Sequence, residues 1–206
     1  MCGIIKNMEE LISNLIKQGV LKDEKIINAF INISRKNFVL PEYKEEACND
    51  YPLPTGYGQT ISQPLTVAFM LELLEVEEEN KILDVGSGSG WTTALLAELA
   101  PQGFVYGVEI ISELVDFGRS NLFRYKFKNA EILQAGETLG LEEKAPFDRI
   151  LVSASTQKLP EELISQLKTG GIMVIPVGNC IFKVKKVSEE KIEMEKFEGF
   201  IFVPLK

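Results

Sequence analysis

Ile82-Leu83-Asp84-Val85-Gly86-Ser87-Gly88-Ser89-Gly90 is the stretch that decides the fold of this chain. The apolar run around Asp84 is typical of a buried strand, and the glycines after it predict a tight turn into a helix. Such a turn lies at the carboxyl end of the first strand of open α/β sheets, where these sheets bind ligands. Glycine adopts positive φ and lets a ligand approach the backbone closely. We therefore expect a ligand site at this turn.

The spacing of the glycines restricts the ligand. A dinucleotide-binding turn has the pattern G-x-G-x-x-G, and counted from Gly86 and Gly88 its third glycine would fall at position 91. That position holds Trp91, the only tryptophan of the chain, and the third glycine stands one place early at Gly90. The Gly-Lys-Ser/Thr of a phosphate-binding loop does not follow. The turn thus indicates a nucleoside ligand without a pyrophosphate, and S-adenosylmethionine is one.

Two carboxylates accompany this turn in the expected sheet. Glu109 stands 25 residues after Asp84, at the end of the next expected strand. A carboxylate there can accept hydrogen bonds from both hydroxyls of a ribose. We expect Glu109 to bind the ribose and Asp84 to orient the methionine part of the cofactor. Each residue also has a simpler interpretation, Glu109 as a solvated charge at a strand end and Asp84 as a turn residue.

From Lys81 onward, apolar strands alternate with helices. We expect strands over Lys81–Val85, Phe104–Glu109, Ala130–Gln134, 148–153 and 171–176, and helices over Trp91–Leu99, Ser112–Tyr125 and 160–167. This alternation predicts a doubly wound, mostly parallel sheet covered on both faces, a Rossmann-like fold of class α/β. Residues 181–187 and 192–203 alternate without a helix between them, which predicts an antiparallel C-terminal edge.

The first 75 residues have a different pattern. Residues 1 to about 50 are expected to be helical, since Ile4, Ile5 and the following apolar residues up to Ile16 recur at helical spacing, and Asp23 is placed to cap a helix over 24–31. Residues 51–63 are rich in proline and glycine and predict a loop, which is followed by a helix over Pro64–Leu74. We expect a single domain over 1–206, with a helical N-terminal cap and loop (1–75) and a cofactor-binding core (76–206).

Composition excludes several classes of function. The net charge of −8 argues against a nucleic-acid partner. The absence of histidine excludes Ser-His-Asp and Cys-His catalysis and most zinc-enzyme chemistry. The three cysteines form no C-x-x-C pair, which is typical of a reducing compartment. No apolar run has the length of a signal peptide or a membrane span, so we expect a cytoplasmic protein.

Further runs along the chain carry a closer resemblance. They are Arg35-Lys36-Asn37-Phe38-Val39, Pro52-Leu53-Pro54-Thr55-Gly56-Tyr57-Gly58-Gln59-Thr60-Ile61-Ser62-Gln63-Pro64, 145–154, 170–178 and Phe202-Val203-Pro204-Leu205. Together with the glycine turn and Trp91, these runs resemble the protein-L-isoaspartate O-methyltransferase family over nearly the whole chain. Glycine turns are common to many methyltransferases, whereas the run over 58–64 is far more specific.

The resemblance implies an activity and a set of site residues. A methyl group would pass from S-adenosylmethionine, leaving S-adenosylhomocysteine, to the free carboxylate of an isoaspartyl residue, and the ester would cyclise to a succinimide. Ser62 would be catalytic, with no metal. The implied cofactor contacts are Gln59, Thr60, Ile61, Asp84, Gly86, Ser87, Gly88, Glu109, Ile110, Gly136 and Glu137, and the implied substrate contacts are Tyr57, Ser62, Ser153, Ala154 and Ser155. The implied partners are isoaspartyl-containing peptides and proteins, with no nucleic acid and no membrane, and we expect a monomer.

The chemistry agrees with the missing histidine. A carboxylate with an ordinary pKa of roughly 4 is already an ionised nucleophile at neutral pH and requires no general base. Three departures from the family pattern keep alternatives open: Leu65 in place of a common histidine, Ala135-Gly136-Glu137 in place of Gly-Asp-Gly, and the polar run over 153–156. The alternatives are a related methyltransferase for another carboxylate or small molecule, and a non-catalytic cofactor-binding module. Thr60 and Ser62 could also simply cap the helix near Pro64.

Overall fold

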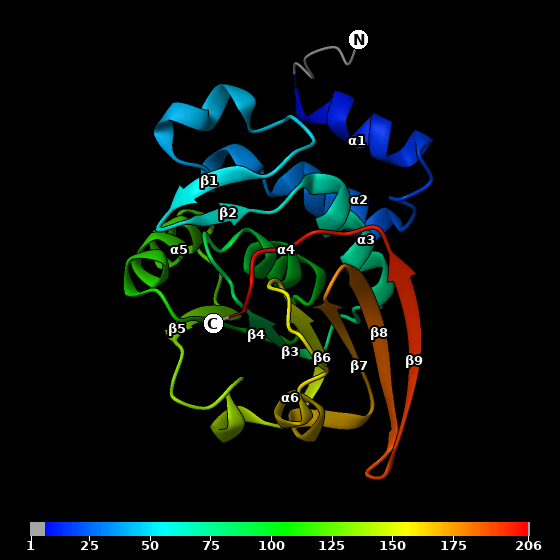
Figure 1. Cartoon of the computed structure of the whole chain (residues 1–206). Coiled ribbons are helices and arrows are strands. Elements are labelled where there is room, and N and C mark those ends of the chain that lie inside the picture. The colour runs from blue at the N-terminus through cyan, green and yellow to red at the C-terminus, as the bar shows by residue number, and fades with distance from the viewer. Residues whose placement is uncertain (1–6, 206) are drawn as a thin grey trace.

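The computed structural model describes residues 7–205 and contains a seven-stranded sheet with helices on both faces (Figure 1). The strands are β3 (Lys81–Val85), β4 (Phe104–Glu109), β5 (Ala130–Gln134), β6 (Phe147–Val152), β7 (Leu167–Val177), β8 (Cys180–Ser188) and β9 (Lys191–Glu198). Their spatial order is β5-β4-β3-β6-β7-β8-β9. Neighbours from β5 to β7 are parallel, while β8 and β9 add antiparallel. The predicted Rossmann-like fold with an antiparallel edge is confirmed.

Each central strand is buried on both faces. Successive strand residues point to opposite sides of a sheet, so Ile82 packs into one apolar core and Leu83 into the other. Leu151 and Ile150 of β6 divide in the same way. The first core lies under α3 (Pro64–Leu74), α4 (Trp91–Leu99) and α5 (Ser112–Tyr125), and the second lies against α6 (Glu161–Gln166). This burial on both faces explains why the strands have continuous apolar sequences.

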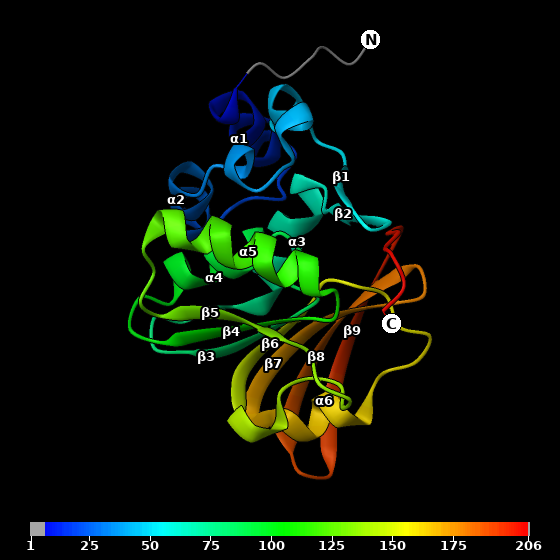
Figure 2. The ribbon, with the colours of Figure 1, turned by 90° about the vertical axis from the view of Figure 1, so that its left-hand side faces the viewer.

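The N-terminal helices lie on the far side of α3 and α4 from the sheet (Figure 2), and their buried side chains belong to the first core. They are α1 (Met8–Lys17) and α2 (Glu24–Asn32), followed by the short 3-10 helices η1 (Arg35–Asn37) and η2 (Pro41–Glu46). Asp23 caps α2 as predicted, because its Oδ1 accepts a hydrogen bond of 2.7 Å from the Lys25 amide. The helical prediction at Ile4 and Ile5 lies outside the described residues. The division into a cap over 1–75 and a core over 76–206 stays a prediction.

The loop predicted over 51–63 is wrong in part, because it contains a β-hairpin. Strands β1 (Leu53–Gly56) and β2 (Gln59–Ile61) pair antiparallel, with Gly56 opposite Gln59. The two residues between them, Tyr57 and Gly58, have φ of 54° and 71°. Positive φ at both central positions is the backbone of a two-residue turn that matches the twist of the strands. The proline and glycine residues therefore shape a hairpin here.

Three predicted boundaries in the C-terminal half are corrected. The helix over 160–167 is shorter, since α6 ends at Gln166 and Leu167 already pairs with Phe147 of β6. Strand β7 consequently begins at Leu167 rather than at position 171. Strand β9 ends at Glu198 rather than at position 203, because Gly199 has φ of +96° and turns the chain out of the sheet. The tail over 200–205 then crosses the end of the sheet, where Pro204 forms an isolated bridge with Ser155.

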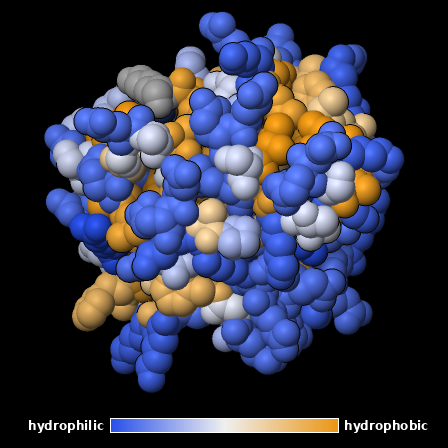
Figure 3. All heavy atoms as spheres, turned by 90° about the horizontal axis from the view of Figure 1, so that it is seen from below, coloured by the Kyte–Doolittle hydropathy of each residue, from blue (hydrophilic) through white to orange (hydrophobic). Residues whose placement is uncertain are grey.

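The edge of the sheet that β9 forms is charged. Lys191, Glu193, Lys196 and Glu198 on β9 form ion pairs of 3.4 Å and 2.7 Å along the strand, and charged side chains on an edge strand discourage pairing with another chain. Seen from the end of the molecule away from α1, hydrophilic residues cover most of the face, with apolar patches between them (Figure 3). No helix within residues 7–205 is long and apolar enough to cross a membrane.

Candidate functional site

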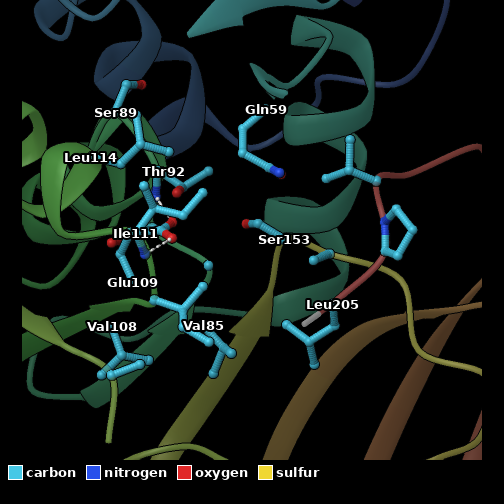
Figure 4. Close-up of a pocket in the computed structure, with 18 of the residues that line it drawn as sticks. Gln59, Val85, Ser89, Thr92, Val108, Glu109, Ile111, Leu114, Ser153 and Leu205 are labelled. Carbon is cyan, nitrogen blue, oxygen red and sulfur yellow. Dashed lines mark hydrogen bonds between the residues drawn. The ribbon is translucent and has the colours of Figure 1, made fainter. Parts of the chain in front are cut away.

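A cavity of about 390 Å³ opens at the carboxyl ends of β3, β4 and β6. The strand order reverses at β3, which has β4 on one side and β6 on the other. This position and this volume are typical of small-molecule sites in open α/β sheets. Figure 4 shows Gln59 of β2 and Ser153 pointing into the space between them, with Glu109 on one side and Leu205 on the other.

Most of the residues predicted for the site line this cavity. They are Gln59, Thr60, Ile61, Ser62, Gly86, Ser87, Gly88, Glu109, Ile110, Gly136, Glu137, Ser153 and Ala154. They come from the β1–β2 hairpin and from the turns that follow β3, β4, β5 and β6. Segments far apart in the sequence thus meet at one end of the sheet, as the parallel topology requires.

The glycine turn is held to the neighbouring strand by its backbone. The amides of Gly86 and Ser87 donate to the carbonyl of Val108 at 2.9 and 3.1 Å. Gly86 and Gly88 have φ of +77° and +52°, a conformation that residues with a side chain rarely adopt. The turn therefore presents bare backbone to the cavity.

Helix α5 approaches the glycine turn at Gly90 rather than at position 91. A Cβ on Gly90 would lie 3.2 Å from the carbonyl oxygen of Gly118 and 3.0 Å from Ile132. Trp91 instead points into the N-terminal core, where it is 1% exposed and meets the ring of Phe30 edge-on at 5.6 Å. The early third glycine thus has a packing reason, and a large residue after it is accommodated on the opposite side of α4.

Glu109 joins the two turns that border the cavity. Its Oε2 accepts a hydrogen bond of 3.0 Å from the amide of Gly88, and its Oε1 accepts one of 2.9 Å from the amide of Ile111. Each carboxylate oxygen has a second lone pair and can accept another donor. Glu109 is therefore a fixed acceptor in the wall of the cavity, suited to a pair of ligand hydroxyls.

The charges of the lining restrict the ligand. Among the lining residues within 7–205, Glu109 and Glu137 carry the only charges, and no Lys or Arg is among them. A phosphate-bearing ligand would lack the cationic partners that phosphates usually bind in proteins. A cationic ligand is favoured by two carboxylates, and S-adenosylmethionine has a sulfonium and an ammonium group. The residues present therefore fit this cofactor. Within residues 7–205, no cluster of His, Cys, Asp or Glu side chains is arranged to hold a metal ion.

Asp84 lies beneath the glycine turn and does not line the cavity. It is fully buried, and its Oδ2 accepts hydrogen bonds from the hydroxyls of Thr92 and Thr93 at 2.7 and 2.6 Å, while Oδ1 has no partner. Burial raises the pKa of Asp84 to about 6, against the opposing effect of the two threonine hydroxyls. Asp84 thus connects the end of β3 with the start of α4.

Ser62 lies in the cavity wall and does not serve as a helix cap. The N-cap residue of α3 is Gln63, which makes no side-chain cap bond. The amide of Leu65 in the first turn donates instead to Oδ1 of Asp50 at 2.8 Å. The interpretation of Thr60 and Ser62 as simple caps is therefore wrong, because the side chain of Asp50 accepts the hydrogen bond from the first turn of α3.

The sequence matches the family model of protein-L-isoaspartate(D-aspartate) O-methyltransferase (PCMT) over residues 6–206. The chain belongs to this family. Among its relatives, the protein-L-isoaspartate O-methyltransferase of Thermococcus onnurineus is 44% identical over 200 residues, which cover 94% of this chain and 90% of the relative. The relative of that name from Methanosarcina mazei is 42% identical, covering 97% and 85%. The resemblance inferred from the sequence is confirmed.

A solved structure from Plasmodium falciparum is similar over the whole chain. It is described as a protein-L-isoaspartate O-methyltransferase beta-aspartate methyltransferase in complex with S-adenosyl-L-homocysteine. The two chains share 27% sequence identity at a TM-score of 0.85, and the similarity covers 98% of this chain and 99% of the other. The chain therefore has the overall fold of this family.

Two of the predicted substrate residues lie outside the cavity lining. Tyr57 is at the tip of the β1–β2 hairpin, 58% exposed. Ser155 uses its backbone to hold the C-terminal tail: its amide donates to the carbonyl of Val203, and its carbonyl accepts from the amide of Leu205, both at 2.8 Å. The tail residues Val203, Pro204 and Leu205 consequently line the cavity, although the sequence reasoning did not include them among the site residues.

Other residues of the site were also missed. Thr92, Ile111, Leu114, Thr138, Leu139 and Gly140 line the cavity without having been predicted. Gln166 of α6 is a buried support: its Nε2 donates to the carbonyl of Leu139, and its Oε1 accepts from the amide of Leu141, at 2.8 and 2.7 Å. The segment over 139–141 has no regular pattern that could have indicated these contacts.

Proposed function

We propose that this protein transfers a methyl group from S-adenosylmethionine to the free carboxylate of L-isoaspartyl residues in damaged proteins, and so starts their repair through a succinimide. The observation that carries the proposal is the cavity, in which the run over 59–62 faces the glycine turn and Glu109 in a member of this family. The names of the relatives support the same activity.

We propose that the glycine turn and Glu109 hold the cofactor. The carboxylate of Glu109 would accept the ribose hydroxyls with its remaining lone pairs, and the exposed backbone of Gly86 and Gly88 would lie along the methionine part. Ile110, with Gly136 and Glu137 on the turn after β5, would border the base. Asp84 would act from below the turn, through its bonds to Thr92 and Thr93. When bound, S-adenosylmethionine supplies a methyl group activated by its sulfonium.

The protein's own contribution to the reaction is position. The carboxylate of the substrate is ionised at neutral pH, so the site requires no base, and no residue in the chain is a histidine. Orienting two reactants can lower a barrier by about 7–11 kcal/mol. The hydroxyl of Ser62 would donate a hydrogen bond to the carboxylate and fix its direction. The tail over 203–205 would cover the reacting groups and exclude water.

The peptide substrate would lie between the hairpin and the tail. Tyr57, exposed at the hairpin tip, would contact residues flanking the isoaspartyl group, and Ser153 and Ala154 would border it inside the cavity. Ser155 would act through the tail that its backbone holds. The expectations of a cytoplasmic monomer without nucleic-acid or membrane partners stay predictions.

A transfer assay tests the activity. The protein is incubated with methyl-labelled S-adenosylmethionine and with paired peptides that contain Asp or isoAsp at one position. Base-labile label on the isoAsp peptide alone is the expected result. Label on another carboxylate, or on a small molecule, would favour a related methyltransferase. Cofactor binding by calorimetry with label on neither peptide would favour a non-catalytic module.

A variant tests the role of Ser62. Ser62→Ala removes one hydrogen bond to a charged group, worth about 1.5–3 kcal/mol, so kcat should fall about 10- to 150-fold. The affinity for S-adenosylhomocysteine should change little, since Glu109 and the glycine turn are untouched. Ser188→Ala, at the exposed end of β8 and outside the cavity lining, is the matched control. An unchanged kcat in Ser62→Ala would remove Ser62 from the catalytic site.

A further inference from the structure

Arg35 is the most deeply buried cation among the described residues. It lies in η1 with no exposed surface, and its guanidinium makes hydrogen bonds only to backbone carbonyls. Nη1 donates to Ala47 and Asn49 at 3.0 and 3.2 Å, and Nη2 donates to Tyr51, Ile61 and Ser62 at 2.9, 3.4 and 3.0 Å. Nη2 has two N–H groups for three acceptors, so one N–H is shared.

These five carbonyls belong to two segments that flank the β1–β2 hairpin. The first segment, 47–51, enters the hairpin, and the second, 61–62, leaves it and continues into α3. One planar guanidinium thus closes the base of the hairpin and ties its end to η1. The carbonyl of Ser62 is among the acceptors, so the backbone that orients the Ser62 side chain is held directly.

The environment of Arg35 keeps it charged and in place. Burial lowers the pKa of Arg35 to about 10, with Asp50 acting in the opposite direction, so the guanidinium remains cationic at neutral pH. The guanidinium carbon Cζ of Arg35 lies over the Trp91 ring, 5.4 Å from the ring centroid. This is a favourable cation–π arrangement. Trp91 begins α4 directly after the glycine turn and lines the cavity. Arg35 therefore contacts both sides of the cavity: the backbone of Ser62 on the hairpin side and the ring of Trp91 on the side of the glycine turn.

We propose that Arg35 is a positioning residue for methyl transfer: it fixes the backbone of Ile61 and Ser62 against 47–51 and so holds the Ser62 hydroxyl toward the cavity. The inference rests on the proposed function, because it acts through the residue that the proposed reaction uses. Burying a cation is unfavourable unless its donors find partners; the N–H groups of Nη1 and Nη2 reach carbonyls, while Nε has no partner. A core of apolar side chains could close this space, but it would remove the donor that these five carbonyls share.

Arg35→Lys is the informative variant. The ammonium preserves the charge over Trp91 but has three donors on one nitrogen and cannot reproduce the planar fork. At a temperature well below unfolding, we expect kcat on the isoAsp peptide to fall about 10-fold or more, since small misplacements of catalytic groups have large effects. Affinity for S-adenosylhomocysteine should change less than kcat, because Glu109 and the glycine turn do not contact Arg35, although Arg35 does hold the carbonyl of Ile61.

Two comparisons separate positioning from general stability. Leu15→Ala removes a buried side chain of α1, remote from the cavity. It should lower Tm at least as much as Arg35→Lys while leaving kcat unchanged. In a double-mutant cycle, Arg35→Lys should cause no further loss of kcat in the Ser62→Ala background, because both changes act on the same hydroxyl. Additive losses, or a wild-type kcat in folded Arg35→Lys, would overturn the proposal.

Hydrogen exchange decides the question if Arg35→Lys does not fold. In the wild-type protein, the amides of 47–51 and 59–62 should open as one cooperative unit, since one side chain holds both segments. Independent opening of 59–62 would overturn the inference. A wild-type protein without activity on isoAsp peptides would contradict the proposed function instead, so the two failures are distinguishable.

Discussion

Asp84→Asn should change the pH dependence of stability by an amount that the structure specifies. Asp84 is fully buried with one carboxylate oxygen unpartnered, and its pKa is about 6 in the folded protein against an ordinary value of 3.8. A difference of about 2 in pKa corresponds to about 3 kcal/mol. Asparagine keeps the shape and has no proton to lose, so this contribution disappears in the variant.

The sign of the effect follows from proton binding. Between pH 3.8 and about 6 the folded protein holds a proton on Asp84 that the unfolded chain has released. The free energy of unfolding therefore falls as pH rises through this window and loses nothing further above it. Relative to the wild type, the free energy of unfolding of Asp84→Asn should therefore increase with pH by about 3 kcal/mol over the whole window. About 2 kcal/mol of this increase falls between pH 4.5 and 7.5.

Urea unfolding at a series of pH values measures this difference. The fluorescence of Trp91, the single tryptophan and 1% exposed, reports the transition. Asp148→Asn is the control of opposite sign: burial raises the pKa of Asp148, but Lys168 and the Lys81 amide outweigh it and lower the pKa overall. This variant should lose stability against the wild type as pH rises. Parallel curves for wild type and Asp84→Asn would refute the reasoning about burial.

Two further variants test the walls of the cavity. Glu109→Gln removes the charge that accepts from the amide of Gly88, and one of its two side-chain atoms becomes a donor facing an amide; calorimetry should find S-adenosylhomocysteine binding weaker by about 100-fold, or about 3 kcal/mol. A change below threefold would count against Glu109 as the ribose acceptor. Gln166→Ala frees the segment over 139–141; the Kd for S-adenosylhomocysteine should rise while kcat at saturation stays near the wild-type value, and an unchanged Kd would remove Gln166 from the support of the site.

Local pattern was sufficient for much of this protein. Apolar runs and helical spacing predict the strands from β3 to β6 and the helices α3, α4 and α5, because burial on both faces of a sheet leaves a continuous apolar signature. The glycine turn and Glu109 could also be predicted as neighbours, because a parallel topology brings the carboxyl ends of neighbouring strands together. The run over 58–64 by itself indicated the family.

Contacts between distant segments could be read only from the tertiary structure. The hairpin over 53–61 depends on two consecutive residues with positive φ, Tyr57 and Gly58, and the first of them has no strong preference for that conformation. The tail over 203–205 reaches the cavity because Gly199 turns it out of the sheet and Ser155 pairs with it.

Arg35 shows the same limit most clearly. Its sequence neighbours give no sign that its guanidinium would meet carbonyls 12 to 27 residues away. From β3 onward, the sequence by itself determined the order of strands and helices and the chemistry of the glycine turn, because hydrophobic periodicity and backbone conformation are local properties. The tertiary structure alone decided which buried polar groups support Ser62 and the cavity, because hydrogen bonds at the base of a hairpin depend on where distant backbone carbonyls converge.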